Sequence, residues 1–198
     1  MSMDPVLRGL FLTVFLLTLV ISGYHRRRAR AGETIARKAE GTPALLLRAA
    51  GGLLLLASIL LAAVAPPWMA WSVLPLPAGL RWAAAAVALA CLPLLWWVFT
   101  SIGSNISETV LTKKTHQLVT HGPYRWVRHP LYAGALLEIL SLALVAESWL
   151  LFLLGCAAAV VFRFVVIPKE ERNLIQAFGR AYEGYRQRTG ALFPRFLR

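Results

Sequence analysis

The feature that most constrains this chain is a series of long apolar segments with almost no charge. Five such segments occupy residues 6–23, 44–65, 78–100, 131–146 and 149–167. A helix of about 20 apolar residues spans the hydrocarbon core of a bilayer. Backbone polar groups in lipid need internal partners, and a helix supplies them within one segment. The sequence therefore predicts an all-α integral membrane protein with about five transmembrane helices.

The composition agrees with this class and excludes several others. Hydrophobic residues make up 58% of the chain and charged residues 15%, whereas soluble domains are about one quarter charged. This excludes a disordered chain, a coiled coil and an ordinary cytosolic enzyme. The net charge of +12 belongs to residues that flank the apolar segments, so it favours membrane lipids as partners and no nucleic acid. No metal site is expected, because no His/Cys cluster has zinc spacing.

The distribution of basic residues predicts the orientation in the membrane. Of the 21 Lys and Arg residues, 19 fall in segments 24–48, 101–130 and 163–198, and the other two are Arg8 and Arg81. In a five-helix chain these three segments share one side, which the positive-inside rule makes cytoplasmic. The first helix is expected to be retained, because its positive charge follows the apolar core and does not precede it. The N-terminus is therefore predicted outside and the C-terminus inside.

The first motif lies in a cytoplasmic segment. Residues 122–134 read G-P-Y-R-x-x-R-H-P-x-Y-x-G, and no Rossmann or P-loop glycine motif occurs in the chain. Pro130 suits the first position of a helix, which would leave His129 beside free backbone N–H groups that could receive an anion. From spacing alone, a basic loop whose Arg125 and Arg128 meet lipid headgroups is an equally good interpretation.

The second motif follows the last apolar segment. Glu170 and Glu171 would lie in the first turn of a helix opened by Pro168, where the helix dipole stabilises acids. Five apolar residues then form one stripe, which predicts a cytoplasmic C-terminal amphipathic helix: Leu174, Ile175, Phe178, Tyr182 and Tyr185. Taken alone, this pattern favours an interfacial helix with capping acids over a ligand site.

Together the two motifs resemble the isoprenylcysteine carboxyl methyltransferase family and the wider group that includes phospholipid methyltransferases. The resemblance covers about residues 101–194, so it divides the chain into three transmembrane helices in 1–100 and a catalytic region in 101–198. It implies S-adenosylmethionine as cofactor and a lipophilic small molecule, lipid or prenylated compound as acceptor. The cofactor contacts implied by motif are His116, Gln117, Leu118, Val119, Tyr124, His129, Pro130, Leu131, Tyr132, Glu170 and, ranked lower, Glu171.

The acceptor site is less well marked. Eukaryotic members of that family carry an arginine just before the acidic pair, where this chain has Val166, and Arg163 one helical turn earlier could replace it. Ionisable residues within the membrane are candidates for holding the polar end of an acceptor. The predicted set is Arg163, Glu138, Glu108 and Asn105, with Trp97 beside them. Glu138 has an alternative interpretation, a buried ion pair with an arginine of another helix.

Other functional classes remain open at this point. A carboxylate acceptor needs no general base, so O-methylation is the expected reaction, with N-methylation of a phospholipid as the main alternative. Membrane sterol reductases, which use NADPH, share R-H-P-x-Y-x-G with this chain. A membrane subunit without enzymatic activity is the third class. Binding of one cofactor and not the other separates the two enzyme classes.

Overall fold

The computed structural model describes residues 3–30, 42–103 and 117–195, which form helices, their connections and two isolated β-bridges. The all-α prediction is confirmed. The elements are α1 (Pro5–Arg30), α2 (Thr42–Val64), the 3-10 helix η2 (Pro66–Ser72), α3 (Ala78–Ile102), the short 3-10 helix η4 (Gly122–Arg125), α4 (Pro130–Val145), α5 (Trp149–Val161), the π-helical turn η5 (Phe162–Val166), α6 (Ile167–Phe178) and α7 (Arg180–Arg188).

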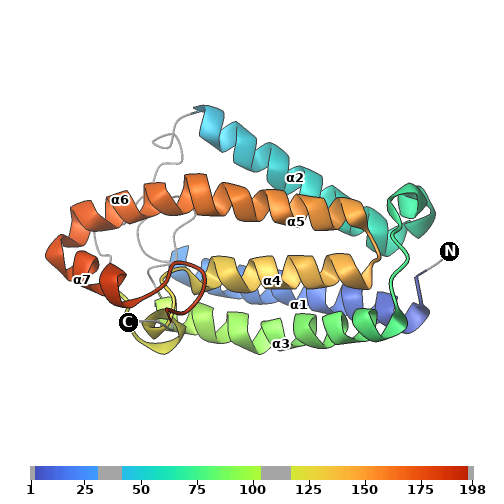
Figure 1. Cartoon of the computed structure of the whole chain (residues 1–198), viewed down its shortest axis with the longest axis horizontal. Coiled ribbons are helices and arrows are strands. Elements are labelled where there is room, and N and C mark those ends of the chain that lie inside the picture. Colours follow the sequence, from blue (N-terminus) through green and yellow to red (C-terminus); the bar gives the residue numbers. More distant parts are fainter. Residues whose placement is uncertain (1–2, 31–41, 104–116, 196–198) are drawn as a thin grey trace.

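The long helices lie side by side and alternate in direction (Figure 1). Helices α1, α3 and α4 form the compact part of the bundle, α5 packs on α4, and α2 leans away at its Thr42 end. The core between them contains many alanines, including Ala63, Ala84, Ala88 and Ala143. Small residues let membrane helices approach closely, so packing rather than exclusion of water holds such an interface.

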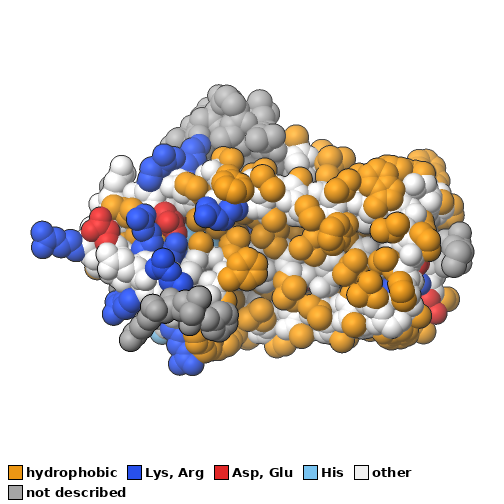
Figure 2. Space-filling model, viewed as in Figure 1, with side chains coloured by type: hydrophobic (Ala, Val, Ile, Leu, Met, Phe, Trp, Pro, Cys, Tyr) orange, Lys and Arg blue, Asp and Glu red, His pale blue; other side chains and the backbone are white. Residues whose placement is uncertain are grey.

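The outer surface suits a lipid environment. Figure 2 shows hydrophobic side chains over most of the bundle, with Lys and Arg gathered at the end formed by α6 and α7. Within the described residues, three helices are long and apolar enough to cross a membrane: Pro5–Ala29, Ala78–Ile102 and Trp149–Phe178. The apolar helices Ala50–Val64 and Pro130–Val145 are shorter. The chain is an integral membrane protein, and a total of five crossings stays a prediction.

The helix that starts at Trp149 is longer than a bilayer requires. Its 30 residues would measure about 45 Å at 1.5 Å per residue, against a hydrocarbon core of about 30 Å. Its last ten residues, which include Glu170 and Glu171, therefore extend beyond the membrane-crossing part.

One expectation about this helix is wrong. Pro168 does not open a new helix, because α5 continues through the π-helical turn directly into α6. The proline ring needs room beside the preceding turn and removes one N–H donor, and the wider π-turn, closed by the Ile167 N–H and the Phe162 carbonyl, accommodates it. The two glutamates thus do not cap a free helix start, so the helix-dipole argument does not apply to them.

The C-terminal segment also differs from the single amphipathic helix predicted. Gly179, at φ 53°, ends α6, and α7 turns back toward η4; glycine adopts this left-handed conformation without steric penalty. Tyr182 and Tyr185 are buried, and the Tyr185 hydroxyl donates to the Tyr124 carbonyl over 2.6 Å. The tyrosines therefore pack inside the protein instead of continuing an interfacial stripe.

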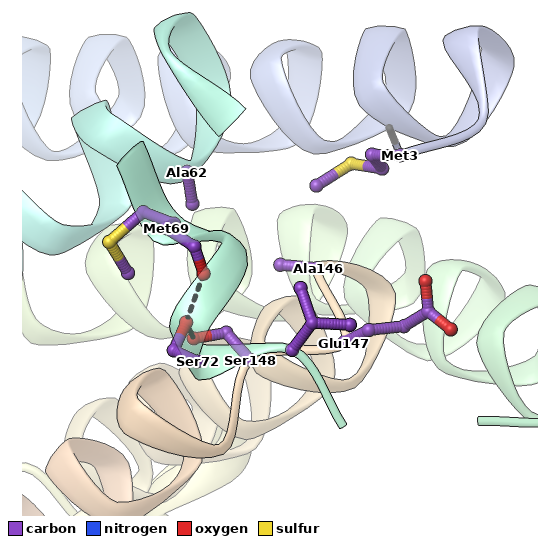
Figure 3. Close-up of a pocket in the computed structure, with 8 residues that line it drawn as sticks. Met3, Ala62, Met69, Ser72, Ala146, Glu147 and Ser148 are labelled. Atoms are coloured by element: carbon purple, nitrogen blue, oxygen red, sulfur yellow. Dashed lines mark hydrogen bonds between the residues drawn. The ribbon is translucent and has the colours of Figure 1, made fainter. Parts of the chain in front are cut away.

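A polar cluster holds the opposite end of the bundle together. Glu147, in the turn between α4 and α5, forms a buried ion pair with Arg81 at 3.1 Å and accepts from the Leu76 N–H. Beside it the Ser72 hydroxyl donates to the Met69 carbonyl (Figure 3) and lies 3.0 Å from the Ser148 hydroxyl. A small pocket there is lined by Met3, Ala62, Met69, Ser72, Val73, Ala146, Glu147 and Ser148. The Ser72–Ser148 contact and the Leu76 N–H bond to Glu147 connect η2 and the chain after it to the α4–α5 turn.

Candidate functional site

The start of α4 and the beginning of α6 together form a polar cluster at the basic end of the bundle. His129 is buried, with its Nδ1 3.5 Å from Glu170 Oε2 and its Nε2 3.4 Å from Glu171 Oε1. The two sequence motifs, about 40 residues apart, therefore meet on one imidazole. Glu170 Oε2 is buried and has no hydrogen-bond partner in the described structure. Apart from its contact with His129 Nδ1 this oxygen is unengaged, and the Tyr182 hydroxyl nearby is likewise buried without a hydrogen-bond partner among the described residues.

Arg128 connects the cluster to α7 and the C-terminal segment at the basic end of the bundle. Its Nε donates to Glu171 Oε1 over 2.7 Å, and both side chains are about nine-tenths buried, at 10% and 13% exposure. Its Nη1 donates to the carbonyls of Arg186 and Thr189. Arg128 is thus a structural residue, and the interpretation that it meets lipid headgroups is wrong.

The C-terminal segment pairs with the chain that leads into α4. The Arg128 N–H donates to the Gly190 carbonyl and the His129 N–H to the Ala191 carbonyl, at 2.9 and 3.0 Å, and Val127 forms a parallel bridge with Gly190. The His129 N–H that the sequence left free for an anion is therefore already bound. These two backbone hydrogen bonds fix the position from which the His129 side chain reaches the two glutamates.

The charged groups in the cluster shift one another's pKa values. Burial disfavours the imidazolium, but the carboxylates of Glu170 and Glu171 outweigh it and raise the pKa of His129 above its ordinary value. Burial also disfavours the Glu171 carboxylate, but His129 and Arg128 outweigh it and lower the pKa of Glu171 to about 2. Burial, followed by the nearby Glu170 charge, raises the pKa of Tyr124. Tyr124 thus lies close enough to Glu170 to be affected by its charge.

Aromatic rings continue the cluster toward α5. The Tyr132 ring is stacked on His129 at 5.7 Å between centroids and on Phe162 at 4.7 Å, each with 11° between the ring planes. Such parallel rings contribute about 0.5–1.5 kcal/mol per pair. Phe162 was not among the predicted residues. It shares a face with the acidic pair only across the π-turn, and a pattern of 3.6 residues per turn does not reveal that.

The other predicted cofactor contacts are less central. Pro130 is buried at the first position of α4, and Leu131 packs toward Ala29 and Phe99 on another side of that helix. Gln117, Leu118 and Val119 lie in the segment that leads into η4. His116 lies outside the described residues.

The two predicted acceptor residues that the structure describes, Glu138 and Arg163, do not join the cluster. Glu138 is buried about 12 Å along α4 from Pro130 at 1.5 Å per residue, and it accepts from the Thr18 hydroxyl of α1 over 2.7 Å. Its partner is thus a hydroxyl and not the arginine of the alternative interpretation. Arg163 is exposed, with its guanidinium 5.3 Å from the Phe164 ring centre. Glu108 and Asn105 lie outside the described residues.

Replacing Gly190 by alanine is expected to loosen the C-terminal segment. A Cβ at Gly190 would lie 1.7 Å from the Phe193 carbonyl oxygen, so the turn must open. A clash of this kind destabilises by about 1–3 kcal/mol, and trypsin should cut at Arg186 or Arg188 faster. Gly184→Ala is the matched control, since nothing lies within 4 Å of its Cβ position and alanine favours a helix. Equal cleavage rates in the two variants would contradict the pairing described above.

Stability should fall as pH rises above 6.5, the ordinary pKa of His129. The carboxylates stabilise the protonated imidazole, so this contribution is fully present below pH 6.5 and is lost as pH rises through the raised value in the folded protein. The contribution of Glu171 is present above its ordinary 4.5 and is lost only as pH falls toward about 2. Thermal unfolding in detergent at about pH 6 and about pH 9 measures the fall. His129→Gln should show less of it, and an identical fall in both proteins would refute the assignment.

Comparison with known proteins shows what this part of the chain is similar to. The sequence model of the isoprenylcysteine carboxyl methyltransferase (ICMT) family matches residues 83–176. The chain is 34% identical over 94 residues to protein-S-isoprenylcysteine O-methyltransferase of Schizosaccharomyces pombe, covering 46% of this chain and 40% of that one. It is 38% identical over 71 residues to methanethiol S-methyltransferase 1 of Bradyrhizobium diazoefficiens, covering 36% and 24%.

A solved structure extends the likeness to nearly the whole fold. The eukaryotic intramembrane Ras methyltransferase ICMT matches with a TM-score of 0.54 and 21% identity, over 93% of this chain and 67% of that one. The chain spans about half or less of the length of the curated relatives that it matches.

The fold and the site define an integral membrane helical bundle with a polar, aromatic-lined cluster at its basic end. Residues 83–176 match the ICMT family model, and the matched residues carry both motifs up to the acidic pair.

Proposed function

We propose that this protein is a membrane methyltransferase that uses S-adenosylmethionine at the His129 cluster and methylates a lipophilic acceptor. One observation carries the proposal: the fold joins both family motifs at His129, with one Glu170 oxygen buried and unpartnered beside it. Residues 101–198 would form the catalytic region, and the first three helices its membrane scaffold.

The residues present fit the cofactor. S-adenosylmethionine supplies an electrophilic methyl group on a sulfonium. Its ammonium and ribose hydroxyls are donors that the free Glu170 oxygen could accept from. The stacked rings of Tyr132 and Phe162 and the buried Tyr124 offer apolar and aromatic surface for its adenine. Arg128 and His129 both contact Glu171, and together they keep the aromatic surface and the Glu170 carboxylate in a fixed relative position.

We propose a carboxylate as the acceptor's reacting group. A carboxylate is already a nucleophile, so alignment and exclusion of water are the main tasks of the protein. Arg163, one residue from the aromatic stack and exposed toward the lipid side, is the candidate for orienting it, and Glu138, Glu108 and Asn105 stay secondary candidates. A thiol acceptor is the second possibility, because three of the similar proteins are named methanethiol S-methyltransferase.

Cofactor binding and product analysis test the activity. Calorimetry in detergent should detect binding of S-adenosylhomocysteine and not of NADPH. With methyl-labelled S-adenosylmethionine, the label should then pass to a farnesylated cysteine analogue in preference to a long-chain thiol or phosphatidylethanolamine. Preferential NADPH binding would move the protein to the reductase class, and labelling of the thiol or amine alone would leave a methyltransferase with a different acceptor.

We further propose that the His129 cluster and the C-terminus face the cytoplasm, with the N-terminus outside. The concentration of basic residues at this end supports the proposal. A cysteine replacing Gln187 in α7 should react with an impermeant maleimide only from the cytoplasmic side, and one replacing Leu74 only from outside. Cys91 and Cys156 are replaced by alanine beforehand. Labelling of both positions from one side would refute this orientation.

A further inference from the structure

The π-helical turn between α5 and α6 has a geometric consequence for the cluster. Nine residues separate Phe162 from Glu171, and in an uninterrupted α-helix, at about 100° per residue, the two would point to opposite faces. A π-turn contains one extra residue, which removes about 100° of rotation from everything that follows. The turn thereby brings Phe162, Glu170 and Glu171 toward the same neighbour, α4.

The contacts on α4 agree with this alignment. Phe162 stacks on Tyr132, Tyr132 stacks on His129, and His129 lies between the two glutamates. Phe164 lies in the same turn, yet its side chain is 68% exposed. The turn thus directs the Phe162 side chain toward the cluster and the Phe164 side chain outward.

We propose that Phe162 is a positioning residue: through Tyr132 its ring holds the His129 imidazole between Glu170 and Glu171. The consequence for cofactor affinity rests on the proposed function, whereas the positioning itself does not. His129 faces charged or titratable groups from three elements, namely Arg128 before α4, Tyr132 on α4, and Glu170 and Glu171 on α6. Phe162, in the π-turn, carries no charge and contacts this group of residues only through its ring.

The test compares Phe162→Leu, which keeps an apolar side chain but removes the ring, with Phe162→Tyr, which keeps the ring. Phe164→Leu, an aromatic removed from the outward face of the same turn, is the matched control. The first readout is the NMR titration of the His129 imidazole in protein with labelled histidine. The chain has four histidines, and His129→Gln assigns the signal. The second readout is affinity for S-adenosylhomocysteine, with thermal midpoints confirming that each variant folds.

In Phe162→Leu the pKa of His129 should fall toward its ordinary value, and affinity for S-adenosylhomocysteine should fall about threefold to tenfold, as for loss of one aromatic pair. Phe162→Tyr should restore both values, and Phe164→Leu should change neither. An unchanged His129 titration in Phe162→Leu, or the same shift in Phe162→Tyr, would overturn the proposal. If the wild-type protein binds no S-adenosylhomocysteine, the proposed function fails, and the titration alone still decides the role of Phe162.

Discussion

Replacing Arg128 by methionine is expected to cause the largest loss of stability of any single change at the basic end of the bundle. The substitution leaves Glu171 buried without its closest cationic partner and frees the carbonyls of Arg186 and Thr189. Removing one partner of a buried ion pair costs about 3–5 kcal/mol, because the other charge stays desolvated. For a chain of this size, this lowers the thermal midpoint by about 10 °C.

Arg125→Met is the control for this change. Arg125 lies three residues earlier, is exposed, and packs over the Trp126 ring at 4.0 Å. An exposed contact of this kind contributes about 0.5–1 kcal/mol, so its variant should stay close to wild type in differential scanning fluorimetry. Similar midpoints for the two variants would mean that Arg128 is not the anchor of the cluster.

Replacing Glu170 by glutamine is expected to have the opposite profile, with a large effect on ligand affinity and a small one on stability. Glu170 is 30% exposed in its side chain, and its contact with His129 Nδ1, at 3.5 Å, is longer than the 2.7 Å bond that Glu171 makes to Arg128. A charge-assisted hydrogen bond to the cofactor contributes about 1.5–3 kcal/mol, which is about tenfold to a hundredfold in affinity. Calorimetry with S-adenosylhomocysteine measures the loss.

Two further variants make this result specific. Glu183→Gln, which removes an exposed acid from α7, should leave affinity unchanged. Glu171→Gln should lower stability, since Glu171 bonds to Arg128 and His129. If Glu170→Gln bound S-adenosylhomocysteine as tightly as the wild-type protein does, Glu170 would have a structural role only.

The sequence predicted the site best where residues of the two motifs contact each other in the structure. His129, Glu170 and Glu171 were predicted as one site and lie together, and Tyr124 and Tyr132 adjoin them. Arg128 was visible in the motif but was assigned to lipid, because spacing cannot tell a loop arginine with a buried partner from one that faces headgroups. Phe162 and Gly190 had no sequence signal, since each acts through a neighbour distant along the chain.

The sequence by itself determined the membrane class, the all-helical fold and the positions of the apolar helices, because hydropathy is a local property of each segment. It did not determine the helix boundaries after Val161, where the π-turn and Gly179 differ from the prediction. Only the tertiary structure decided the roles within the acidic pair. Glu171 is held by Arg128 and His129, while Glu170 keeps a free oxygen. The reason is the rotation introduced at the π-turn and the fold-back at Gly179. Both depend on how α6 and the C-terminal segment pack against α4, and no pattern within one segment encodes that packing.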